Sequence, residues 1–509
     1  MIESAPCEAT AVRPRRRPPF SLLATLALLS ACAAGPDYRP PALPRAAAYV
    51  RGALPARTSA SDVLGGNAQR FVAGLDLPGQ WWTLFRSAPL NRLIARALAH
   101  NPTLEAAQAA LRQADENLAA QRGSLYPAVA GSLGAVRERA SGAAFGSPRP
   151  VLYTLNSASV NVSYTLDAFG GVRRQVEALR AQAEYQRFAL EASYLSLTAN
   201  IVTAAVTEAS LRDQLAATLQ IVRVQRAQLR IIRRRLAAGG ASRADLLQQK
   251  AVLAATLAGL PQLQNALAQQ QNLLATYTGS LPADYAGAAF HLDSLTLPAE
   301  LPVSLPSRLV EQRPDIRAYA ALLHEATAEV GVATANMLPQ ITLSGAYGAQ
   351  AVRFADLFSP ASVVWNLAAS VTQPIFEGGK LRHARRAAIA AAQGAAANYK
   401  ATVLTAFQDV SDTLLALQAD ARSLTAEAAA ERAAAGSLSL AQVEYKSGAT
   451  SYPQVLAAEQ SAESAMVGLV KARAQRYADT AALFQALGGG WWHRSDVQKH
   501  SNDCCKGHL

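Results

Sequence analysis

The sequence has 509 residues and a mass of 53.6 kDa, with 50% hydrophobic but only 6% aromatic residues. Charged residues make up 17%, below the usual quarter, which excludes wholesale disorder. The net charge of +12 is not accompanied by an aromatic-interleaved basic tract, so it does not indicate a nucleic-acid partner, and four cysteines exclude a disulfide scaffold.

Residues 1–31 have the order of parts of a secretory signal peptide. Four arginines at residues 13–17 precede an apolar stretch at residues 20–29, and Ser30 and Ala31 then precede Cys32. A cysteine at this place resembles the bacterial lipobox, where the thiol is acylated and becomes the mature N-terminus; the alternative is a buried cysteine of an ordinary leader. Cys32 is followed by Ala33 and not by an aspartate, a pattern similar to that of lipoproteins sorted to the outer membrane. No later run of about 18 apolar residues exists, so we expect no transmembrane helix.

The rest of the chain repeats itself once. Asn101-Pro102 corresponds to Arg313-Pro314 at an offset of 212 residues, and Gly239 corresponds to Gly448 at an offset of 209. Near-constant offsets over such a length indicate a tandem duplication, and the spacing is far too long for a solenoid.

Each half is expected to run helix, strand, strand, very long helix, tight turn, helix. Apolar residues at three- and four-residue spacing predict helices at 90–122, 172–236 and 243–278 in the first half, and at 307–337, 380–446 and 453–487 in the second. At 1.5 Å per residue the long helices would be about 98 and 100 Å, which is nearly the summed length of the two shorter helices of the first half, 90–122 and 243–278. One long helix therefore fits against two shorter ones stacked end to end. Asn101-Pro102 should interrupt or bend the helix at 90–122, and Pro261 should kink the helix at 243–278.

Alternating residues predict amphipathic strands. Apolar and polar side chains alternate at 159–166, 341–344 and 365–372, whereas 128–137 is small and strand-compatible and 139–150 is a loop. Four strands cannot close a barrel, and open edges are not tolerated in lipid. Subunits would have to pool strands, eight from two copies or twelve from three. The alternative is a soluble four-stranded sheet beside a helical bundle.

Several motifs occur in order along the chain. They are Cys32 with Gly35-Pro36-Asp37-Tyr38, Trp81-Trp82 with Phe85, Asn101-Pro102, Leu166-Asp167-Ala168-Phe169-Gly170, Arg313-Pro314-Asp315-Ile316-Arg317, Leu338-Pro339 and Gln373-Pro374-Ile375-Phe376-Glu377-Gly378-Gly379. Together they resemble the TolC family of outer-membrane efflux channels, in particular its lipoprotein branch that serves resistance-nodulation-division (RND) pumps. The resemblance covers residues 32–491 and implies a mainly α protomer with a β membrane section, whose homotrimer forms a twelve-strand barrel and a helical periplasmic tunnel.

With the resemblance, the chain divides into six parts. These are a signal peptide (1–31), a lipid-anchored extended segment (32–89), a first repeat (90–279), an equatorial linker (280–312), a second repeat (313–490) and a disordered tail (491–509).

The resemblance also implies functional residues. The helical tips would dock a periplasmic adaptor through Gly239, Gly240, Gly448, Ala449 and Thr450, although such glycines also serve simply to end helices. Tyr445 would bond to Asp245 as a gating latch, where the alternative for Asp245 is a helix cap. The constriction positions are Gln454 and Ala457, which departs from the family's aspartates.

Two further features are left open. Arginines at 223, 226, 230, 233 and 234 share one face of a helix. This face is either a solvated or salt-bridged surface, a contact with the adaptor, or a tunnel entrance that attracts anions. The tail residues His493, His500, Cys504, Cys505 and His508 make a poor tetrahedral metal site, so we expect neither a metal nor another cofactor besides the lipid on Cys32.

The expected function is conduction, not catalysis. No phosphate loop or acid–base pair is recognisable, so the sequence predicts no enzyme. The resemblance implies an outer-membrane lipoprotein that works with a periplasmic adaptor and an inner-membrane RND pump to export drugs or toxic small molecules, with no nucleic-acid partner. The alternatives are the channel of an ABC-type secretion system and a non-conducting periplasmic coiled-coil scaffold.

Overall fold

A computed structural model describes residues 33–42, 48–141, 143, 146 and 149–494. Cys32 and the tail residues beyond 494 lie outside the described residues. The described chain forms two units: residues 33–39, 116–180 and 324–393 belong to the first, and residues 40–115, 181–323 and 394–494 to the second. Both repeats contribute to both units, so the duplication did not produce two separate domains. The six-part division of the chain stays a prediction.

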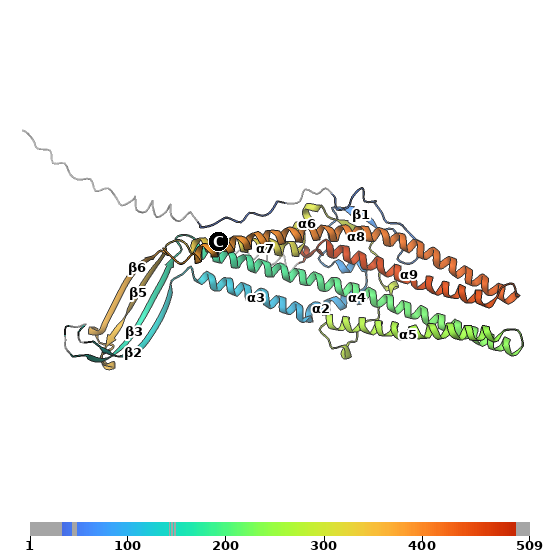
Figure 1. Cartoon of the computed structure of the whole chain (residues 1–509), viewed down its shortest axis with the longest axis horizontal. Helices are drawn as coiled ribbons and strands as arrows, with labels where there is room; N and C mark the ends of the chain where they lie inside the picture. Colours follow the sequence, from blue (N-terminus) through green and yellow to red (C-terminus); the bar gives the residue numbers. More distant parts are fainter. Residues whose placement is uncertain (1–32, 43–47, 142, 144–145, 147–148, 495–509) are drawn as a thin grey trace, which may run out of the picture. The chain divides into compact units, whose positions relative to one another are not determined.

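The first unit contains a four-stranded antiparallel sheet in the order β2-β3-β5-β6. Its strands are β2 (Ala128–Ala140), β3 (Val151–Leu166), β5 (Gln340–Ala351) and β6 (Val363–Thr372). Two hairpins, one from each repeat, therefore lie edge to edge (Figure 1). The strands β2 and β3 are longer than predicted because the pairing of Ala140 with Val151 takes in part of the expected loop.

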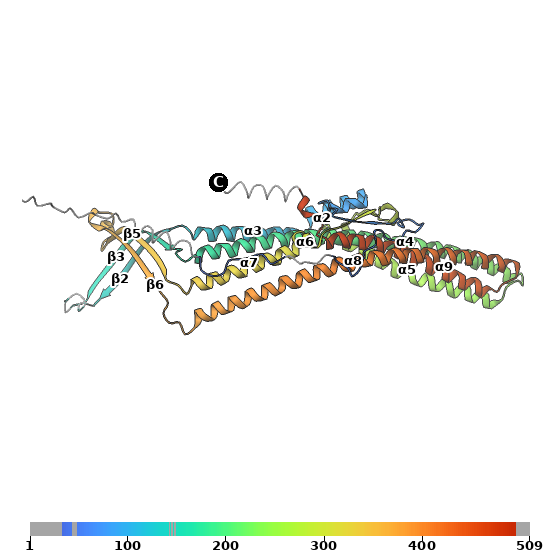
Figure 2. The same ribbon diagram turned by 90° about the horizontal axis from the view of Figure 1, so that it is seen from above.

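Long helices make up most of the second unit. The helices are α2 (Ala88–His100), α3 (Pro102–Gly123), α4 (Gly171–Ala237), α5 (Arg243–Tyr277), α6 (Pro306–Gln312), α7 (Pro314–Ala335), α8 (Lys380–Ser447) and α9 (Tyr452–Ala486), of which α3, α4, α7 and α8 also extend into the first unit. The helices α8 and α9 run side by side to a tight turn, as both views show (Figure 1 and Figure 2). The helices α4 and α5 form the matching hairpin through contacts among Val222, Leu229, Leu253 and Leu260.

Two of the predicted helical stretches consist of two helices each. The interruption predicted at Asn101-Pro102 is confirmed: α2 ends at His100 and α3 begins at Pro102, and the Asn101 side chain accepts hydrogen bonds from the backbone of Thr103 (3.0 Å) and Leu104 (3.1 Å). The prediction of one helix at 307–337 was wrong, because Arg313 before Pro314 is extended and separates α6 from α7. In contrast, α5 continues through Pro261 without a break.

The core of the second unit includes segments for which the sequence predicted no regular structure. The strands β1 (Arg70–Ala73) and β4 (Glu300–Val303) pair in parallel, and a 3-10 helix at Trp81–Phe85 places Trp81 and Phe85 against Phe484. Trp81 is 1% exposed and Phe85 fully buried. Further 3-10 turns lie at Pro282–Asp284, Leu292–Ser294 and Trp491–His493.

One 18-residue window of α4 reaches a mean hydropathy of 1.2, which is apolar enough for a membrane helix by composition. Half of that window is buried inside the structure, and a packed helix of a helical bundle passes the same test of length and composition. Composition alone therefore does not make α4 a membrane helix.

Candidate functional site

The sheet of the first unit has one apolar and one polar face. Directly paired residues of an antiparallel sheet lie on the same face. The register therefore aligns Val129, Val162 and Leu367 on one face, while the next row aligns Asn161 and Asn366 on the other.

The exposure of the apolar face is high. On β6, Trp365 is 75% and Leu367 82% exposed, and Leu133 on β2 is 72% exposed. On the polar face, the Ser132 and Ser159 hydroxyls lie 2.8 Å apart and the Asn161 amide donates to Ser132 Oγ at 3.1 Å. Within the described residues, β2 and β6 each pair on one side only. A sheet with a lipid-compatible face, a hydrated face and two open edges has the properties of part of a membrane barrel.

Both helical tips end in the same backbone motif. At the first tip (residues 238–242), Gly239 has a φ of +78°, and the Gly240 N–H donates to the Arg235 carbonyl at 2.7 Å. At the second tip (residues 448–451), Gly448 has a φ of +80° and the Ala449 N–H donates to the Glu444 carbonyl at 2.8 Å. This is the Schellman motif, which requires positive φ at its glycine. The helix-ending role of Gly239 and Gly448 is thus established, and docking at the tips stays a prediction.

The predicted latch residues have other contacts in the structure. The Asp245 carboxylate accepts from the Ser242 N–H at 2.9 Å and its own N–H donates to Ser242 Oγ at 3.0 Å, which is a capping box at the start of α5. The Tyr445 ring lies 4.7 Å from the Arg235 guanidinium and 5.2 Å from the Tyr452 ring. No hydrogen bond between Tyr445 and Asp245 occurs among the described residues. The latch itself stays a prediction.

Sequence reasoning missed Tyr452, a buried tyrosine at the second tip, where α9 begins. Tyr452 is 4% exposed and its hydroxyl donates to the Gln249 side chain, while Gln249 Nε2 donates to the Gln225 carbonyl at 3.2 Å. Burial, followed by the charge of Glu459, raises the pKa of Tyr452. Hydrogen bonds between buried polar groups thereby connect α9 with α5 and α5 with α4. Only the position of Tyr452 at a helix start was visible in the sequence.

The predicted constriction residues lie on the exposed side of α9. Gln454 and Ala457 are both exposed, and the Gln454 side chain accepts a hydrogen bond from the Thr450 hydroxyl. The nearby acid Glu459 is instead buried, with 6% exposure. Whether Gln454 and Ala457 form the narrowest point stays a prediction.

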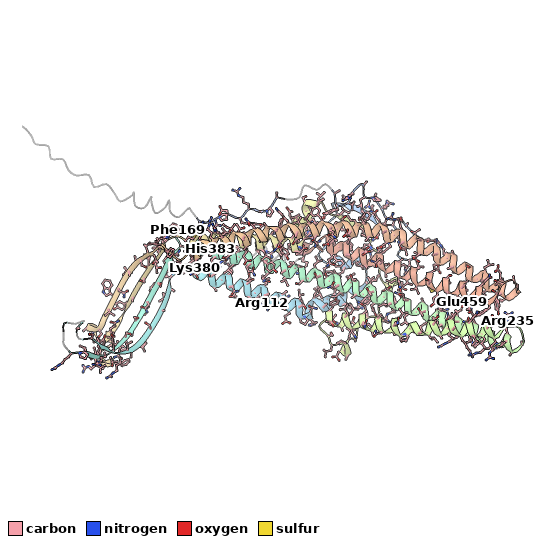
Figure 3. The ribbon with its side chains drawn as sticks, viewed as in Figure 1. Arg112, Phe169, Arg235, Lys380, His383 and Glu459 are labelled. Atoms are coloured by element: carbon pink, nitrogen blue, oxygen red, sulfur yellow. The ribbon has the colours of Figure 1, made fainter. Side chains whose placement is uncertain are left out.

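Glu459 is an acid in an unusual setting near this tip (Figure 3). Among the described residues, none makes a hydrogen bond of normal geometry to either of its carboxylate oxygens. Burial raises the pKa of Glu459 to about 7, an effect that the nearby Gln228 amide opposes and the charge of Glu463 reinforces. The acid is therefore ready to change its charge near neutral pH.

The Arg313-Pro314-Asp315 motif has a structural role. The Arg313 guanidinium pairs with Asp315 at 2.6 Å and with Asp409 of α8 at 2.9 Å, and also donates to the Ala486 carbonyl at 3.2 Å. Burial alone would lower the pKa of Arg313, but the two carboxylates outweigh it and raise that pKa. One side chain thus connects the start of α7 with α8 and with the end of α9.

A second buried arginine connects α9 with the N-terminal segment of the second unit. Arg476 is fully buried and donates to the Gly65 carbonyl at 2.8 Å, the Asn67 carbonyl at 3.1 Å and the Gln69 side chain at 3.2 Å. Nothing in the sequence pattern distinguished it from the other arginines. Close by, burial and the neighbouring Asp479 raise the pKa of Asp420 to about 8.

The Gly35-Pro36-Asp37-Tyr38 motif belongs to a strap (Ala34–Arg39) in the first unit. The Ala34 N–H donates to the Phe169 carbonyl at 2.9 Å, and Asp37 pairs with Arg174 of α4 at 2.6 Å. The Tyr38 ring stacks on His324 with centroids 4.2 Å apart. The strap is therefore attached where β3 passes into α4.

Within the described part of the chain, no group of three or more His, Cys, Asp or Glu side chains is arranged to hold a metal ion. His493 pairs with Asp76 at 2.8 Å, and the other histidines and cysteines of the predicted tail lie outside the described residues.

Comparison with known proteins identifies the class. The profile of the family named outer membrane efflux protein matches residues 93–280 and 305–489, and the chain belongs to this family. The pyoverdine export outer membrane protein OpmQ of Pseudomonas aeruginosa is 32% identical, over 82% of this chain and 88% of the relative. The probable efflux pump outer membrane protein TtgC of Pseudomonas putida is 28% identical, over 94% of this chain and 96% of the relative.

A solved structure agrees with these relatives. That of the outer-membrane channel OprN superimposes with a TM-score of 0.82 at 27% identity, over 90% of this chain and 100% of the other. The family resemblance and the fold class predicted from the sequence are confirmed: the chain is a mainly helical tandem-repeat protomer with a β membrane section. The protein is an outer-membrane channel of an efflux system.

Proposed function

We propose that three copies of this chain form the lipid-anchored outer-membrane channel of a tripartite efflux system, in which a periplasmic adaptor and an inner-membrane RND pump deliver drugs or toxic small molecules. The observation that carries the proposal is the four-stranded sheet with one apolar face, one polar face and two open edges. Three such sheets close into twelve strands and leave a polar bore. The proposal includes no catalytic step.

The strap supports lipid anchoring at Cys32. Ala34, two residues after Cys32, is hydrogen-bonded to Phe169, three residues after the end of β3. Two residues of extended chain span about 7 Å, so acyl chains on Cys32 would begin close to one end of the membrane section. Several acyl chains anchor a protein stably, whereas one is marginal.

The relatives support export of small molecules. OpmQ is named for the export of pyoverdine, and another relative, the toluene efflux pump outer membrane protein TtgC of Pseudomonas putida, for that of toluene. A water-filled channel selects weakly, so the pump would choose the substrate. The two hairpin ends, each with its Schellman turn, are the sites we propose for the adaptor.

In-cell cross-linking followed by purification and mass spectrometry tests this assignment. Recovery of an RND-type adaptor cross-linked at the tips is expected. A secretion-type adaptor would indicate protein or peptide cargo in an ABC-type system. A monomer in the periplasmic fraction would indicate a non-conducting scaffold.

Lipidation is tested separately with a Cys32→Ser variant. Mass spectrometry of the mature wild-type N-terminus is expected to show a diacylglyceryl cysteine with an amide-linked acyl chain, and the variant to lack both. An unmodified wild-type Cys32 would refute lipidation and leave the channel assignment standing.

A further inference from the structure

The two hairpins differ strongly in charge although they are repeats of each other. Residues 214–261 hold eight basic side chains and a single acid, Asp245, which gives a net charge of +7. The corresponding residues 423–470 of the second repeat hold two basic and five acidic side chains, for a net charge of −3. The positive charge is therefore not a shared feature of the repeat but distinguishes the first hairpin from the second.

The positive charge of α4 is concentrated on one exposed face. The basic stripe consists of Arg223, Arg226, Arg230, Arg233 and Arg234, all of them exposed. Their spacing of three and four residues keeps them on one side of the helix. No carboxylate of the described residues lies within ion-pair distance of any of them; the one polar contact of the stripe is from Arg223 to Gln220 at 2.9 Å. Like charges at this spacing repel, so the stripe costs stability in the isolated protomer.

Arg235 follows the stripe in the sequence but has a different role. It is half-buried, and its guanidinium lies against the Tyr445 ring of α8 (Figure 3 labels Arg235). The side of α4 with Arg235 and Ile232 therefore faces α8 and α9, and the side with Val222 and Leu229 faces α5. The basic stripe lies on neither of these sides, so the packing of the protomer leaves it open.

Exposed apolar residues accompany the stripe with a period of seven. Val224 directly follows Arg223 and is 39% exposed, and Ile231 directly follows Arg230 and is 54% exposed. Residues seven positions apart recur on the same side of a helix, so Val224 and Ile231 offer two apolar contacts to a second helix that packs on this side. A purely water-facing wall does not require large aliphatic residues, and arginine is enriched at protein interfaces.

We propose that this face of α4 binds an acidic helix of the periplasmic adaptor, whose apolar heptad residues cover Val224 and Ile231 and whose carboxylates pair with the basic stripe. The proposal rests on the tripartite function above and adds the chemistry of the partner at the first hairpin. Because exposed charges steer association and are screened by salt, binding should be fast and strongly salt-dependent.

The test uses the purified full-length chain in detergent and two synthetic helical-hairpin peptides. Both peptides have the same apolar heptads, one with glutamates on the flanking positions and one with glutamines. The glutamate peptide is expected to bind, to weaken at least tenfold between 50 and 300 mM NaCl, and to bind at least tenfold better than the glutamine peptide. Equal binding of the two peptides, or of neither, would overturn the proposal.

Variants locate the binding face. The stripe variant Arg226→Glu/Arg230→Glu/Arg233→Glu should lose the glutamate peptide. Its control, Arg112→Glu/Arg382→Glu/Arg386→Glu, makes the same change in charge at exposed arginines of α3 and α8 and should bind like the wild type. If the stripe variant does not assemble, the neutral Arg→Gln triple serves instead. Retained binding by either stripe variant would refute this site. A changed anion preference in planar bilayers with unchanged peptide binding would assign the stripe to the channel entrance instead.

A complementation assay separates this inference from the proposed function. The wild-type gene should restore drug resistance to a host that lacks its own copy, and the stripe variant should not. If the wild type fails, the efflux assignment fails, whatever the peptides do. If the stripe variant also restores resistance, only the docking proposal fails.

Discussion

Glu459 provides a quantitative test of how the buried layer at the second tip responds to pH. Its carboxyl is 6% exposed, and burial raises its pKa from 4.5 to about 7. A raised carboxyl pKa means that the folded hairpin binds the proton more tightly than the unfolded one. The contribution of Glu459 to the stability of the hairpin is therefore greatest below pH 4.5. It falls as the pH rises from 4.5 to 7 and is lowest above pH 7.

The size of the effect follows from the shift. Each pKa unit is worth about 1.4 kcal/mol, so the ionisation of Glu459 destabilises the folded hairpin by about 3 kcal/mol at pH 8. Glu459→Gln removes the charge and keeps the shape. The variant should gain about 3 kcal/mol at pH 8 and less than about 1 kcal/mol at pH 5, where wild-type Glu459 is protonated in the folded state.

Hydrogen–deuterium exchange of peptides from the first half of α9 measures this gain, since local opening sets the exchange rate. At pH 8 the variant should exchange about a hundredfold more slowly than the wild type, and at pH 5 the two should differ by less than about fivefold. Glu431→Gln on the same hairpin, at a half-buried position of α8, is the matched control and should change little. Equal exchange of wild type and Glu459→Gln at pH 8, or the same gain at both pH values, would refute the reasoning.

Two further substitutions test the other contacts. Arg313→Ala should destabilise the protein by about 1–3 kcal/mol, because it removes a guanidinium of 12% exposure from two carboxylates. The cost stays moderate because these carboxylates are 35% and 43% exposed and water can partly solvate them. The readout is the temperature at which trimers dissociate on gels, and an unchanged temperature would contradict it. Tyr445→Phe keeps the ring against Arg235 and removes only the hydroxyl. It should raise detergent and antibiotic leakage if Tyr445 is a latch; unchanged leakage with normal trimer levels would count against that role.

The sequence alone determined the architecture of the protomer because periodicity is a local property. Long apolar repeats predicted α4 at 172–236 and α8 at 380–446, and the structure has them at Gly171–Ala237 and Lys380–Ser447. Alternation predicted which residues of β3, β5 and β6 share a face, and the register agrees. The equivalence of Gly239 and Gly448 was also visible, since both end helices in the same Schellman motif.

Only the tertiary structure decided which polar residues are buried and what they contact. Arg476 and the arginines of the basic stripe are the same residue type on similar helices, yet Arg476 is fully buried among backbone carbonyls and the stripe is exposed. Glu459 likewise differs from Glu431 only through the helices packed around it. Burial depends on segments hundreds of residues apart in the chain, as the bond between Arg476 and Gly65 shows. No local pattern contains that information, because desolvation is set by the whole environment of a side chain.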